Sequence, residues 1–397
     1  MEHLALYRKY RSKTFDEIIG QKHITKTLIN QINKGEISHS YLFTGTRGTG
    51  KTSIAKIFAK AINCLHPKNG SPCNECEVCK ALNDNNNIDI VEMDAASNNS
   101  VDDIRDIRDK VKYPPVYGKY KVYIVDEVHM LTQSAFNALL KTLEEPPAFV
   151  VFILATTEIQ KIPATILSRC MRFDFKLVSE LDLSEHLKRV FKDSGIKYED
   201  EAITLIARLG QGSVRDMLSI ADMCVAFSNG NVTYESVTDA IGVTNKDVLY
   251  DLCGHIINKD AKGILTSIDL SARSGKNMAQ LAKDMVEYVR DITVVKTCAN
   301  HKDILAYPDG EINKLRDLAE RTTTDKLLNY LKSLNSLEQE FRYTSNAREL
   351  LEIVLLGLVV DESNEIARLK AKVKELEEKI ATMVHPWKEH QGRKKSI

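Results

Sequence analysis

A glycine-rich run lies between a short apolar segment and an apolar-periodic stretch, and this arrangement constrains the fold more than any other feature. The run reads Gly45-Thr-Arg-Gly-Thr-Gly-Lys51-Thr52 and fits G-x-x-x-x-G-K-[ST]. Residues 41–43 before it are apolar, and residues 53–62 after it carry apolar side chains at helical spacing. Strand, glycine loop and helix in this order form a phosphate-binding loop. A glycine turn that only resembles the pattern would rarely have both flanks in place.

The residue types explain how such a loop holds phosphate. Glycines let successive backbone N–H groups point inward without a Cβ clash, and the N-terminus of the following helix adds positive dipole. Lys51 is expected to neutralise β- and γ-phosphate charge, and the Thr52 hydroxyl is expected to ligate Mg²⁺. The predicted nucleotide-binding residues of the loop are Gly45, Gly48, Gly50, Lys51, Thr52 and Ser53.

A second segment, residues 121–127, is an apolar strand that ends in two acids, Asp126 and Glu127. A buried parallel strand has a continuous apolar run, and ligands bind beyond its carboxyl end. Asp126 is therefore placed to hold Mg²⁺ through water, and Glu127 to polarise a water for attack on a γ-phosphate. A strand that simply ends in a polar loop would explain this segment alone, but not its pairing with the glycine loop.

Composition narrows the class of protein. The 397 residues suffice for two or three domains, and the 43% of hydrophobic residues suffice for real cores. Basic and acidic residues number 55 each, which argues against coating nucleic acid by bulk charge but not against a local basic groove. No apolar run reaches the roughly eighteen residues of a membrane span, and the N-terminus lacks a signal-peptide core. We therefore expect a cytoplasmic protein whose cysteines are reduced or metal-bound.

Four cysteines cluster directly after the predicted phosphate-loop helix. Cys64, Cys73, Cys76 and Cys79 have the spacing C-x8-C-x2-C-x2-C, which matches a closed tetrahedral Zn²⁺ site within an insertion at residues 64–79. Four ligands leave no open position, so the zinc is predicted to be structural. The alternative is a set of unliganded cysteines. The other four are predicted to be small buried hydrophobes: Cys170, Cys224, Cys253 and Cys298.

Periodicity divides the chain into four parts. Residues 1–180 alternate apolar strands with helical stretches, which predicts an α/β domain with a parallel sheet. Residues 181–243 are predicted to be helices only, and residues 244–360 a second all-helical block. Residues 361–397 form a tail. The expected strands are 40–44, 88–93, 121–126, 149–155 and 171–176.

The tail carries a heptad-spaced apolar seam with Lys and Glu between its positions. Fewer than three heptads are present, so the pattern leaves two alternatives open: an intermolecular coiled coil or a helix docked on its own domain. Pro386 is expected to end the helix, and a disordered end to follow it. The seam consists of Ile366, Leu369, Val373, Leu376, Ile380 and Met383.

Several further short motifs accompany the glycine loop and the cysteine insertion. They are Tyr7-Arg-Lys-Tyr-Arg11 with Phe15 and Ile18-Ile19-Gly20-Gln21, Asp94-Ala-Ala-Ser97, Asp126-Glu127-Val-His-Met-Leu131, Leu139-Leu-Lys-Thr-Leu-Glu-Glu-Pro-Pro147, Ala155-Thr-Thr157, Ser168-Arg169-Cys170 and Gly212-Ser-Val-Arg215-Asp216.

With these motifs, residues 1–360 resemble the gamma/tau subunits of bacterial DNA polymerase III, which are the clamp-loader ATPases of the AAA+ family. Two departures are small: Thr46 and Ser12 stand where proline is common. Because the chain stops at residue 397, it resembles the short, gamma-like form or a truncated one, without the polymerase-coupling domains.

The resemblance implies roles that the residues alone do not establish. Arg169 would be an arginine finger that acts in trans on a neighbouring subunit's nucleotide. Thr157 would be sensor 1 beside the γ-phosphate, and Arg215 would be sensor 2 in the small helical domain. Without the family, a surface salt bridge would be the commoner fate of either arginine. The residues implied to flank the adenine are Tyr10, Arg11, Ile18 and Ile19.

The expected architecture is an AAA+ domain with a zinc-binding insertion, then a helical lid and a helical oligomerisation (collar) domain. The implied cofactors are ATP, Mg²⁺ and structural Zn²⁺. The implied partners are other clamp-loader subunits, copies of the chain itself, the sliding clamp and primer-template DNA, with no membrane. ATP would hold the clamp open, and hydrolysis would release it on primed DNA. Two alternatives remain: a non-hydrolysing scaffold subunit, disfavoured by intact Lys51, Asp126 and Glu127, and a DNA-remodelling ATPase such as a junction helicase motor.

Overall fold

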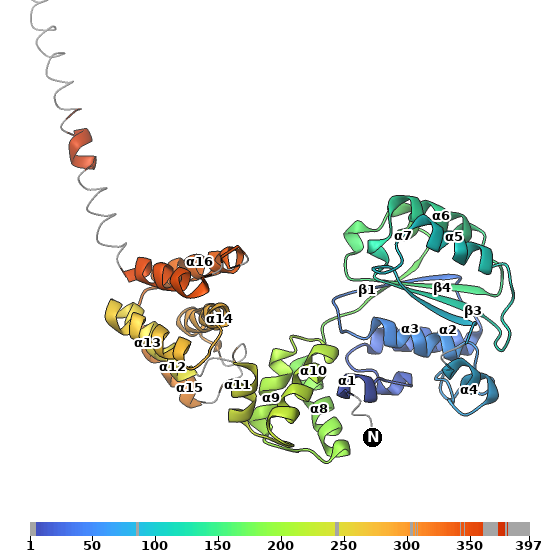
Figure 1. Ribbon diagram of the computed structural model, residues 1–397, viewed down its shortest axis with the longest axis horizontal. Helices are drawn as coiled ribbons and strands as arrows, with labels where there is room; N and C mark the ends of the chain where they lie inside the picture. The colour runs from blue at the N-terminus through green and yellow to red at the C-terminus, as the bar shows by residue number, and fades with distance from the viewer. Residues whose placement is uncertain are drawn as a thin grey trace, which may run out of the picture. The chain divides into compact units, whose positions relative to one another are not determined.

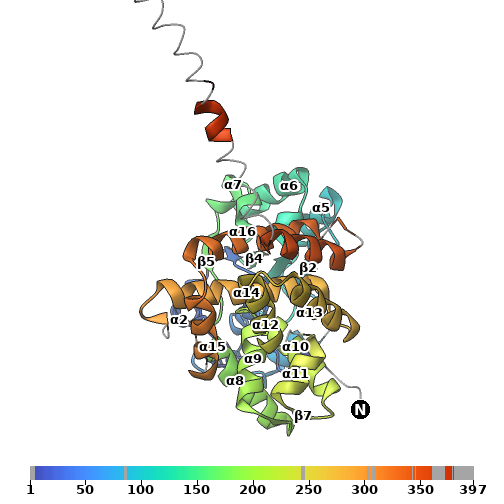
Figure 2. The same cartoon turned by 90° about the vertical axis from the view of Figure 1, so that its left-hand side faces the viewer.

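The computed structural model describes residues 5–84, 87–242, 246–301, 305, 307, 309–341, 343–344, 346–359, 372–377 and 379. The chain forms two compact units, residues 1–240 and 241–397. The first unit contains the phosphate-loop pattern, the cysteine cluster and all but the last three residues of the segment expected to form the lid. The second unit is helical where it is described (Figures 1 and 2).

A parallel five-stranded sheet organises the first unit, in the order β2-β3-β4-β1-β5. The predicted parallel sheet is confirmed, and no predicted strand end differs from the observed one by more than two residues. The strands are β1 (Ser40–Thr44), β2 (Ile90–Asp94), β3 (Lys121–Asp126), β4 (Val150–Thr156) and β5 (Met171–Asp174).

The register of the sheet brings the functional segments to one edge. Thr44 at the end of β1 pairs with Thr156 at the end of β4, and Asp94 pairs with Asp126. The Gly45 N–H then donates to the Thr156 carbonyl at 3.2 Å. Because all strands run the same way, the glycine loop, the acidic pair and the residues after β4 emerge at the same edge, where ligands bind in open α/β sheets.

Helices cover both faces of the sheet (Figure 1). Side chains along a strand alternate between faces, so Tyr41 and Phe43 of β1 join one core cluster while Leu42 joins the other. Phe58 packs in the first cluster and Phe136 in the second. The first face carries α2 (Lys22–Lys34) and α3 (Lys51–Ala61), and the second carries α5 (Val101–Lys110), α6 (Gln133–Glu144) and α7 (Ala164–Leu167).

Short helical elements lie before α2 and between the strands. Two of them precede α2, and a third lies after α3, next to the clustered cysteines. Three-residue 3-10 helices follow β3 and β4. These elements are α1 (Leu6–Lys9), η1 (Phe15–Glu17), α4 (Glu77–Asn83), η2 (Val128–Met130) and η3 (Ile159–Lys161).

The residues after the sheet are mostly helical, but the expectation of helices only is wrong in one detail. Lys197 and Tyr198 pair in parallel with Asn231 and Val232. Left-handed Gly195 and a turn at residues 228–230 bring the two segments together, and two residues are too few for an alternating pattern in the sequence. The elements are α8 (Glu180–Ser194), β6 (Lys197–Tyr198), α9 (Asp200–Leu209), α10 (Val214–Phe227), β7 (Asn231–Val232) and α11 (Tyr234–Ile241).

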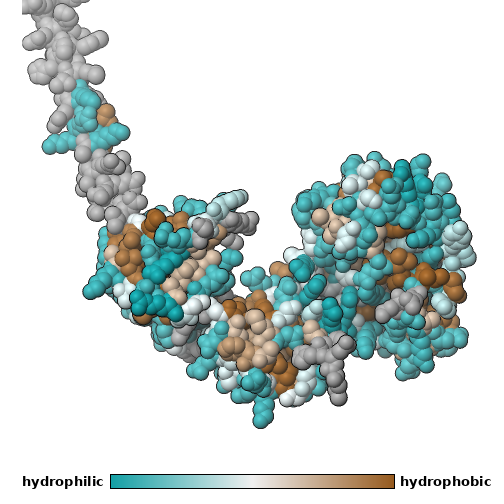
Figure 3. All heavy atoms as spheres, viewed as in Figure 1, coloured by the Kyte–Doolittle hydropathy of each residue, from teal (hydrophilic) through white to brown (hydrophobic). Residues whose placement is uncertain are grey.

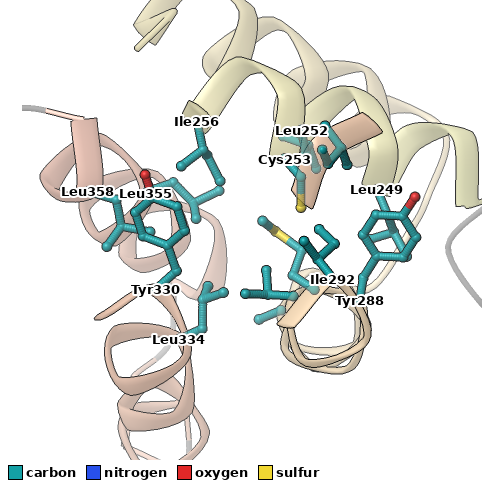
Figure 4. Close-up of a cluster of buried hydrophobic side chains, with 14 of the residues drawn as sticks. Leu249, Leu252, Cys253, Ile256, Tyr288, Ile292, Tyr330, Leu334, Leu355 and Leu358 are labelled. Atoms are coloured by element: carbon teal, nitrogen blue, oxygen red, sulfur yellow. The ribbon is translucent and has the colours of Figure 1, made fainter. Parts of the chain in front are cut away.

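The second unit packs its helices around α14 (Met278–Thr297), which contacts α12 (Lys246–Ile257), α15 (Asp309–Glu320) and α16 (Thr324–Glu340). Helix α13 (Ala261–Arg273) packs on α12, and residues 347–359 are also helical. Figure 4 shows Cys253 and Ile256 of α12 facing Ile292 and Leu334 in this core. Burial raises the pKa of the Cys253 thiol to about 12, so it behaves as an apolar side chain.

The remaining scattered cysteines divide in two. Cys224 is buried, as expected, whereas Cys170 and Cys298 are only partly buried.

The four heptad positions Ile366, Leu369, Ile380 and Met383 lie outside the described residues. Of the seam, the structure describes Val373 and Leu376, which lie on a helical segment and are half-exposed. The choice between a coiled coil and a docked helix therefore stays open.

The visible face in Figure 3 is largely hydrophilic, with apolar side chains in separate patches. None of the helices described here combines the length and the apolar character that a membrane crossing requires.

Candidate nucleotide site and cysteine cluster

The glycine loop connects β1 to α3 with a backbone that requires its glycines. Gly45, Gly48 and Gly50 all have positive φ, at 149°, 77° and 101°. A Cβ on Gly45 would lie 2.6 Å from the Phe175 carbonyl oxygen, and one on Gly48 would lie 1.9 Å from Ser213 Oγ. The loop is therefore confined between Phe175, which directly follows β5, and the start of α10, and Gly50 lies directly before the first residue of α3.

Lys51 begins α3 and is only 5% exposed. Its Nζ donates to the carbonyls of Gly45 at 2.7 Å and Thr46 at 2.9 Å, so the ammonium group lies over the loop. Burial lowers the Lys51 pKa, and the charges of Glu127 and Asp126 oppose that effect. An ammonium group has three protons. Two of them bond to the carbonyls, so the third can donate to a phosphate oxygen.

The next residue, Thr52, meets the acid at the end of β3. Its Oγ1 donates to Asp126 Oδ2 at 2.7 Å, while the Glu127 N–H donates to Asp126 Oδ1 at 3.0 Å. A hydroxyl and a carboxylate at the edge of a phosphate loop are oxygen ligands of the kind that Mg²⁺ takes together with phosphates. The residues predicted to hold Mg²⁺ therefore fit that ion.

Glu127 lies in the left-handed region, at φ 47° and ψ 43°. This conformation is uncommon for a residue with a side chain. Glu127 Oε2 accepts a hydrogen bond from Thr157 Oγ1 at 3.1 Å. The predicted base and the predicted sensor 1 residue are therefore in direct contact.

His129 is a residue for which the sequence predicted no role. Its Nδ1 lies 3.4 Å from Glu127 Oε2, and its Nε2 lies 3.4 Å from Glu158 Oε1. The histidine follows the two acids by two and three residues, so its proximity was visible in the sequence. Its orientation depends on the 3-10 turn at residues 128–130, which no sequence pattern indicated.

The helical part of the first unit reaches the loop through the N-terminus of α10. The Val214 N–H donates to the Gly48 carbonyl at 3.1 Å, and Ser213 caps the helix. Arg215 follows directly, and its Cβ would lie 3.3 Å from a Cβ on Gly48. Its guanidinium lies 5.6 Å from the centre of the Tyr7 ring. The structure thus places the predicted sensor 2 arginine beside the phosphate loop.

The four residues expected around the adenine fall into two groups. Tyr10 and Arg11 line a cavity of about 330 Å³ with His186 and Arg189 of α8. Tyr10 also shares a hydrogen bond with Ser194 at 2.6 Å. The described lining of this cavity does not include the other two residues, Ile18 and Ile19, which are half-buried just before Gly20.

Gly20 and Gln21, which follow Ile18 and Ile19, contact the segment after β5. A Cβ on Gly20 would lie 3.1 Å from Val178 Cγ2. Gln21, which is fully buried, donates to the Lys176 carbonyl at 2.7 Å and accepts from the Lys176 N–H at 3.2 Å. The segment before α2 is therefore held against the chain that leads from the sheet into α8.

Arg169 lies away from its own glycine loop. The Arg169 carbonyl accepts from Ser40 Oγ at 2.6 Å, and Ser40 is the first residue of β1 whereas Gly45 follows its last. Five residues of strand span roughly 16 Å, beyond the reach of one arginine side chain. The guanidinium pairs with Glu144 at 2.7 Å and donates to the Thr165 carbonyl at 2.7 Å.

The four clustered cysteines converge with their sulfur atoms all within 4.8 Å of one another. Cys64 Sγ lies 3.5 Å from Cys73 Sγ, and Cys73 Sγ lies 3.9 Å from Cys79 Sγ. Thiolates bound tetrahedrally at about 2.3 Å would be roughly 3.8 Å apart. The cysteine set and its spacing therefore fit Zn²⁺.

Backbone N–H groups point at these sulfur atoms and favour thiolates. Cys73 Sγ accepts from the Cys76 N–H at 3.3 Å, and Cys76 Sγ accepts from the Cys79 N–H at 3.4 Å. Hydrogen bonds from the Glu75 and Cys76 backbone lower the pKa of the Cys73 thiol to about 6, whereas burial raises the pKa of the Cys64 and Cys79 thiols. Zinc ligation requires deprotonated sulfur, so the surroundings of Cys73 suit a metal ligand, and a bound cation would favour the thiolate at Cys64 and Cys79.

Family models with three descriptions match successive parts of the chain. Residues 20–179 match "DNA polymerase III, delta subunit", and residues 182–230 match "DNA polymerase III clamp loader subunit, ATPase lid domain". Residues 232–374 match "DNA polymerase III subunits gamma and tau domain III".

Curated relatives match over most of the chain. The tau subunit of Bacillus subtilis is 40% identical over 386 residues, which cover 96% of this chain and 68% of the relative. The gamma subunit of Buchnera aphidicola is 34% identical, with 91% and 99% covered. The chain spans only 55% of the tau subunit of Escherichia coli, at 37% identity.

A solved structure of the Thermotoga maritima RuvB Holliday junction branch migration motor also matches, with a TM-score of 0.46 and 20% identity, over 62% of this chain and 79% of that one. This similarity is too low to bear on function. The sequence relatives are decisive, because two of them exceed 30% identity while the chain covers more than two thirds of their length. The chain belongs to the gamma/tau subunit family of bacterial DNA polymerase III, the AAA+ ATPases of the clamp loader.

Proposed function

We propose that the chain hydrolyses ATP as a motor subunit that loads a ring-shaped sliding clamp onto primed DNA. The observation that carries the proposal is the meeting of the Thr52 hydroxyl with Asp126, next to Glu127, at the edge where the glycine loop begins. A scaffold subunit would need none of these groups. Family membership indicates the process that such hydrolysis would drive, which is clamp loading.

In the proposed mechanism, Lys51 and the N–H groups of the glycine loop bind the β- and γ-phosphates. Thr52 and Asp126 would hold Mg²⁺, which neutralises charge that develops on the phosphates. Glu127 would take a proton from the attacking water, and Thr157, which donates to Glu127, would lie beside the γ-phosphate. Most of the catalysis is then positioning and electrostatics.

Two arginines would link this site to movement. The contact between the start of α10 and Gly48 supports Arg215 as the group that senses nucleotide from the lid. The distance between Arg169 and its own loop supports an action in trans. The Arg169–Glu144 pair is half-exposed, and such pairs contribute only about 0.2–1 kcal/mol. Little therefore opposes a change of partner at a subunit interface.

The functional division along the chain is also proposed. Residues 1–180 would form the ATPase domain, 181–243 the lid and 244–360 the collar through which subunits assemble. Residues 361–397 would form an additional tail. Other clamp-loader subunits, copies of this chain, the clamp and primer-template DNA would be the partners, in the cytoplasm. Zn²⁺ on Cys64, Cys73, Cys76 and Cys79 would stabilise the insertion of the ATPase domain.

ATP turnover by the assembled loader tests the proposal. We expect hydrolysis to rise when clamp and primed DNA are added together, and to stay low with either alone. The Glu127→Gln chain in the same assembly is the matched control and should not respond. A junction motor would hydrolyse ATP irrespective of the clamp, so turnover that ignores the clamp would contradict the loader assignment.

A further inference from the structure

His129 lies between two carboxylates at the nucleotide edge of the sheet. Its side chain is 7% exposed, and its two ring nitrogens each lie 3.4 Å from an acid, Glu127 on one side and Glu158 on the other. Apolar packing alone does not explain a buried histidine here, because both ring nitrogens face a carboxylate.

The ring is held in a fixed orientation. Nδ1 also lies 3.1 Å from Thr156 Oγ1, and that hydroxyl accepts from the Glu158 N–H at 3.0 Å. Thr156 is fully buried as the last residue of β4. Since the Glu127 carboxylate can only accept, the Nδ1 that faces it must carry a proton, and the Thr156 hydroxyl can accept from the same N–H. The imidazole is thereby fixed to the rigid end of a central strand.

Glu127 needs such support more than most residues. Its backbone is left-handed, and Thr157 gives its Oε2 a single hydrogen bond. One hydroxyl contact leaves a three-torsion side chain with alternative rotamers. A general base must be held within about 0.5 Å of its productive position. A second fixed contact on the same oxygen atom would meet that requirement.

We propose that His129 is a positioning residue for hydrolysis, whose buried ring holds the Glu127 carboxylate in the orientation that receives the water's proton. Nδ1–H makes the contact with Glu127, and Nε2 lies 3.4 Å from Glu158 Oε1 on the far side of the ring. Glu158 is itself paired with Lys161 at 2.9 Å, which completes a line from the base to the surface. This inference rests on the proposed ATPase function.

Three substitutions separate positioning from structure. His129→Leu removes both ring nitrogens, His129→Asn keeps an amide near the place of Nδ1, and His129→Gln moves the amide toward the place of Nε2. In the assembled loader, we expect His129→Leu to lower kcat roughly ten- to a hundredfold, the scale of small misplacements in an active site. His129→Asn should retain clearly more activity than His129→Gln.

The binding step should not change. None of these variants touches the glycine loop, so the Kd of a fluorescent ATP analogue should stay within about twofold of the parent value, by equilibrium titration. His39→Leu is the matched control. His39 also uses Nδ1, at 3.3 Å from the Val150 carbonyl, but at the opposite end of β4. Its substitution should leave kcat unchanged.

The inference would be wrong if His129→Leu turned over ATP at the parent rate, or faster, because the ring would then restrain Glu127. Equal losses of kcat in His129→Asn and His129→Gln would also contradict it. So would a loss of nucleotide affinity that parallels the loss of kcat. If His129→Leu does not fold, the comparison of Asn with Gln still decides. Failure of the ATPase assignment has a different signature, because Glu127→Gln would then turn over ATP at the parent rate.

Discussion

The Thr52 hydroxyl donates to Asp126 Oδ2 across 2.7 Å, although 74 residues separate the two in the chain. Parallel strands bring them together, because β1 and β3 both end at the edge where α3 begins. The contact brings together the glycine loop and the acidic strand end, the two halves of the proposed site. Substitution of Thr52 and of Asp126 can therefore measure what each residue contributes to the response to Mg²⁺.

The first prediction tests the Thr52–Asp126 pair directly. Thr52→Ala and Asp126→Asn should each raise the Mg²⁺ concentration that gives half-maximal ATP turnover, because the first removes an oxygen ligand of the expected site and the second removes the negative charge beside it. The double variant should be little worse than the worse single one, since residues that hold one ion are not additive. Titration of turnover against Mg²⁺ gives the result, and fully additive losses would contradict a shared ion.

A second prediction separates nucleotide binding from hydrolysis. Lys51→Ala removes a charged hydrogen bond worth about 1.5–3 kcal/mol, so the Kd for ATP should rise roughly ten- to a hundredfold. Glu127→Gln should bind ATP normally and fail to hydrolyse it, because an amide cannot accept the water's proton. Parallel binding titrations and turnover assays decide. Parent-rate hydrolysis by Glu127→Gln would remove the proposed base.

The third prediction concerns the close approach of the lid to the loop. Gly48→Ala would place a Cβ 1.9 Å from Ser213 Oγ at a φ of 77°, so both nucleotide affinity and melting temperature should fall. Gly35→Ala is the matched control, because Gly35 has a φ of 73° but nothing within 4 Å of the added atom. The control should show only the backbone cost of about 1–2 kcal/mol. Equal effects would mean that the contact with Ser213 is unimportant.

A fourth prediction tests the metal. Purified under reducing conditions, the chain should contain one Zn²⁺ per molecule by elemental analysis. Cys76→Ser should lose the metal and lower the stability of the insertion, because Cys76 also caps α4 through the Cys79 N–H. Cys224→Ser, at a buried site in α10, is the control and should keep full zinc content. Substoichiometric zinc in the parent chain would contradict the assignment.

Much of the ATPase fold was predictable because its signals are local and strong. Continuous apolar runs such as residues 121–125 occur in buried parallel strands, and the cysteine spacing alone indicated one cluster. The role of His129 was not predictable, because its contacts with Glu127 and Glu158 depend on a 3-10 turn and on the register of β4. The pairing of Lys197 with Asn231 was missed because two-residue strands leave no periodicity.

The arginine of the Ser-Arg-Cys motif shows a different limit. Nothing near Arg169 in the sequence indicates Glu144, its partner in the structure, which lies 25 residues earlier on α6. A surface ion pair was the ordinary expectation for an arginine, and the structure does contain one. Such a pair does not by itself exclude a second partner on another subunit. The location of Arg169, remote from its own glycine loop, and the resemblance of its motif to that of the family favour that second partner.

The last prediction tests this second partner. If Arg169 acts in trans, Arg169→Ala subunits should still bind ATP, because their own glycine loops are intact, but they should not stimulate a neighbour. Arginine fingers typically contribute about 10³–10⁵ in rate, so a homogeneous Arg169→Ala assembly should be nearly inactive. Lys51→Ala subunits fail for the opposite reason, since they carry the arginine but bind nucleotide weakly.

Mixing the two variants joins an intact loop of one chain to an intact arginine of the other, so some complete interfaces should form and activity should partly return. An arginine that acts in cis predicts no recovery at any ratio, because no single chain carries both groups. Native mass spectrometry can show that mixed assemblies are present, and melting curves can show that both variants are folded. No recovery under those conditions would remove the interfacial site, and Arg169 would then be explained by its pair with Glu144 alone.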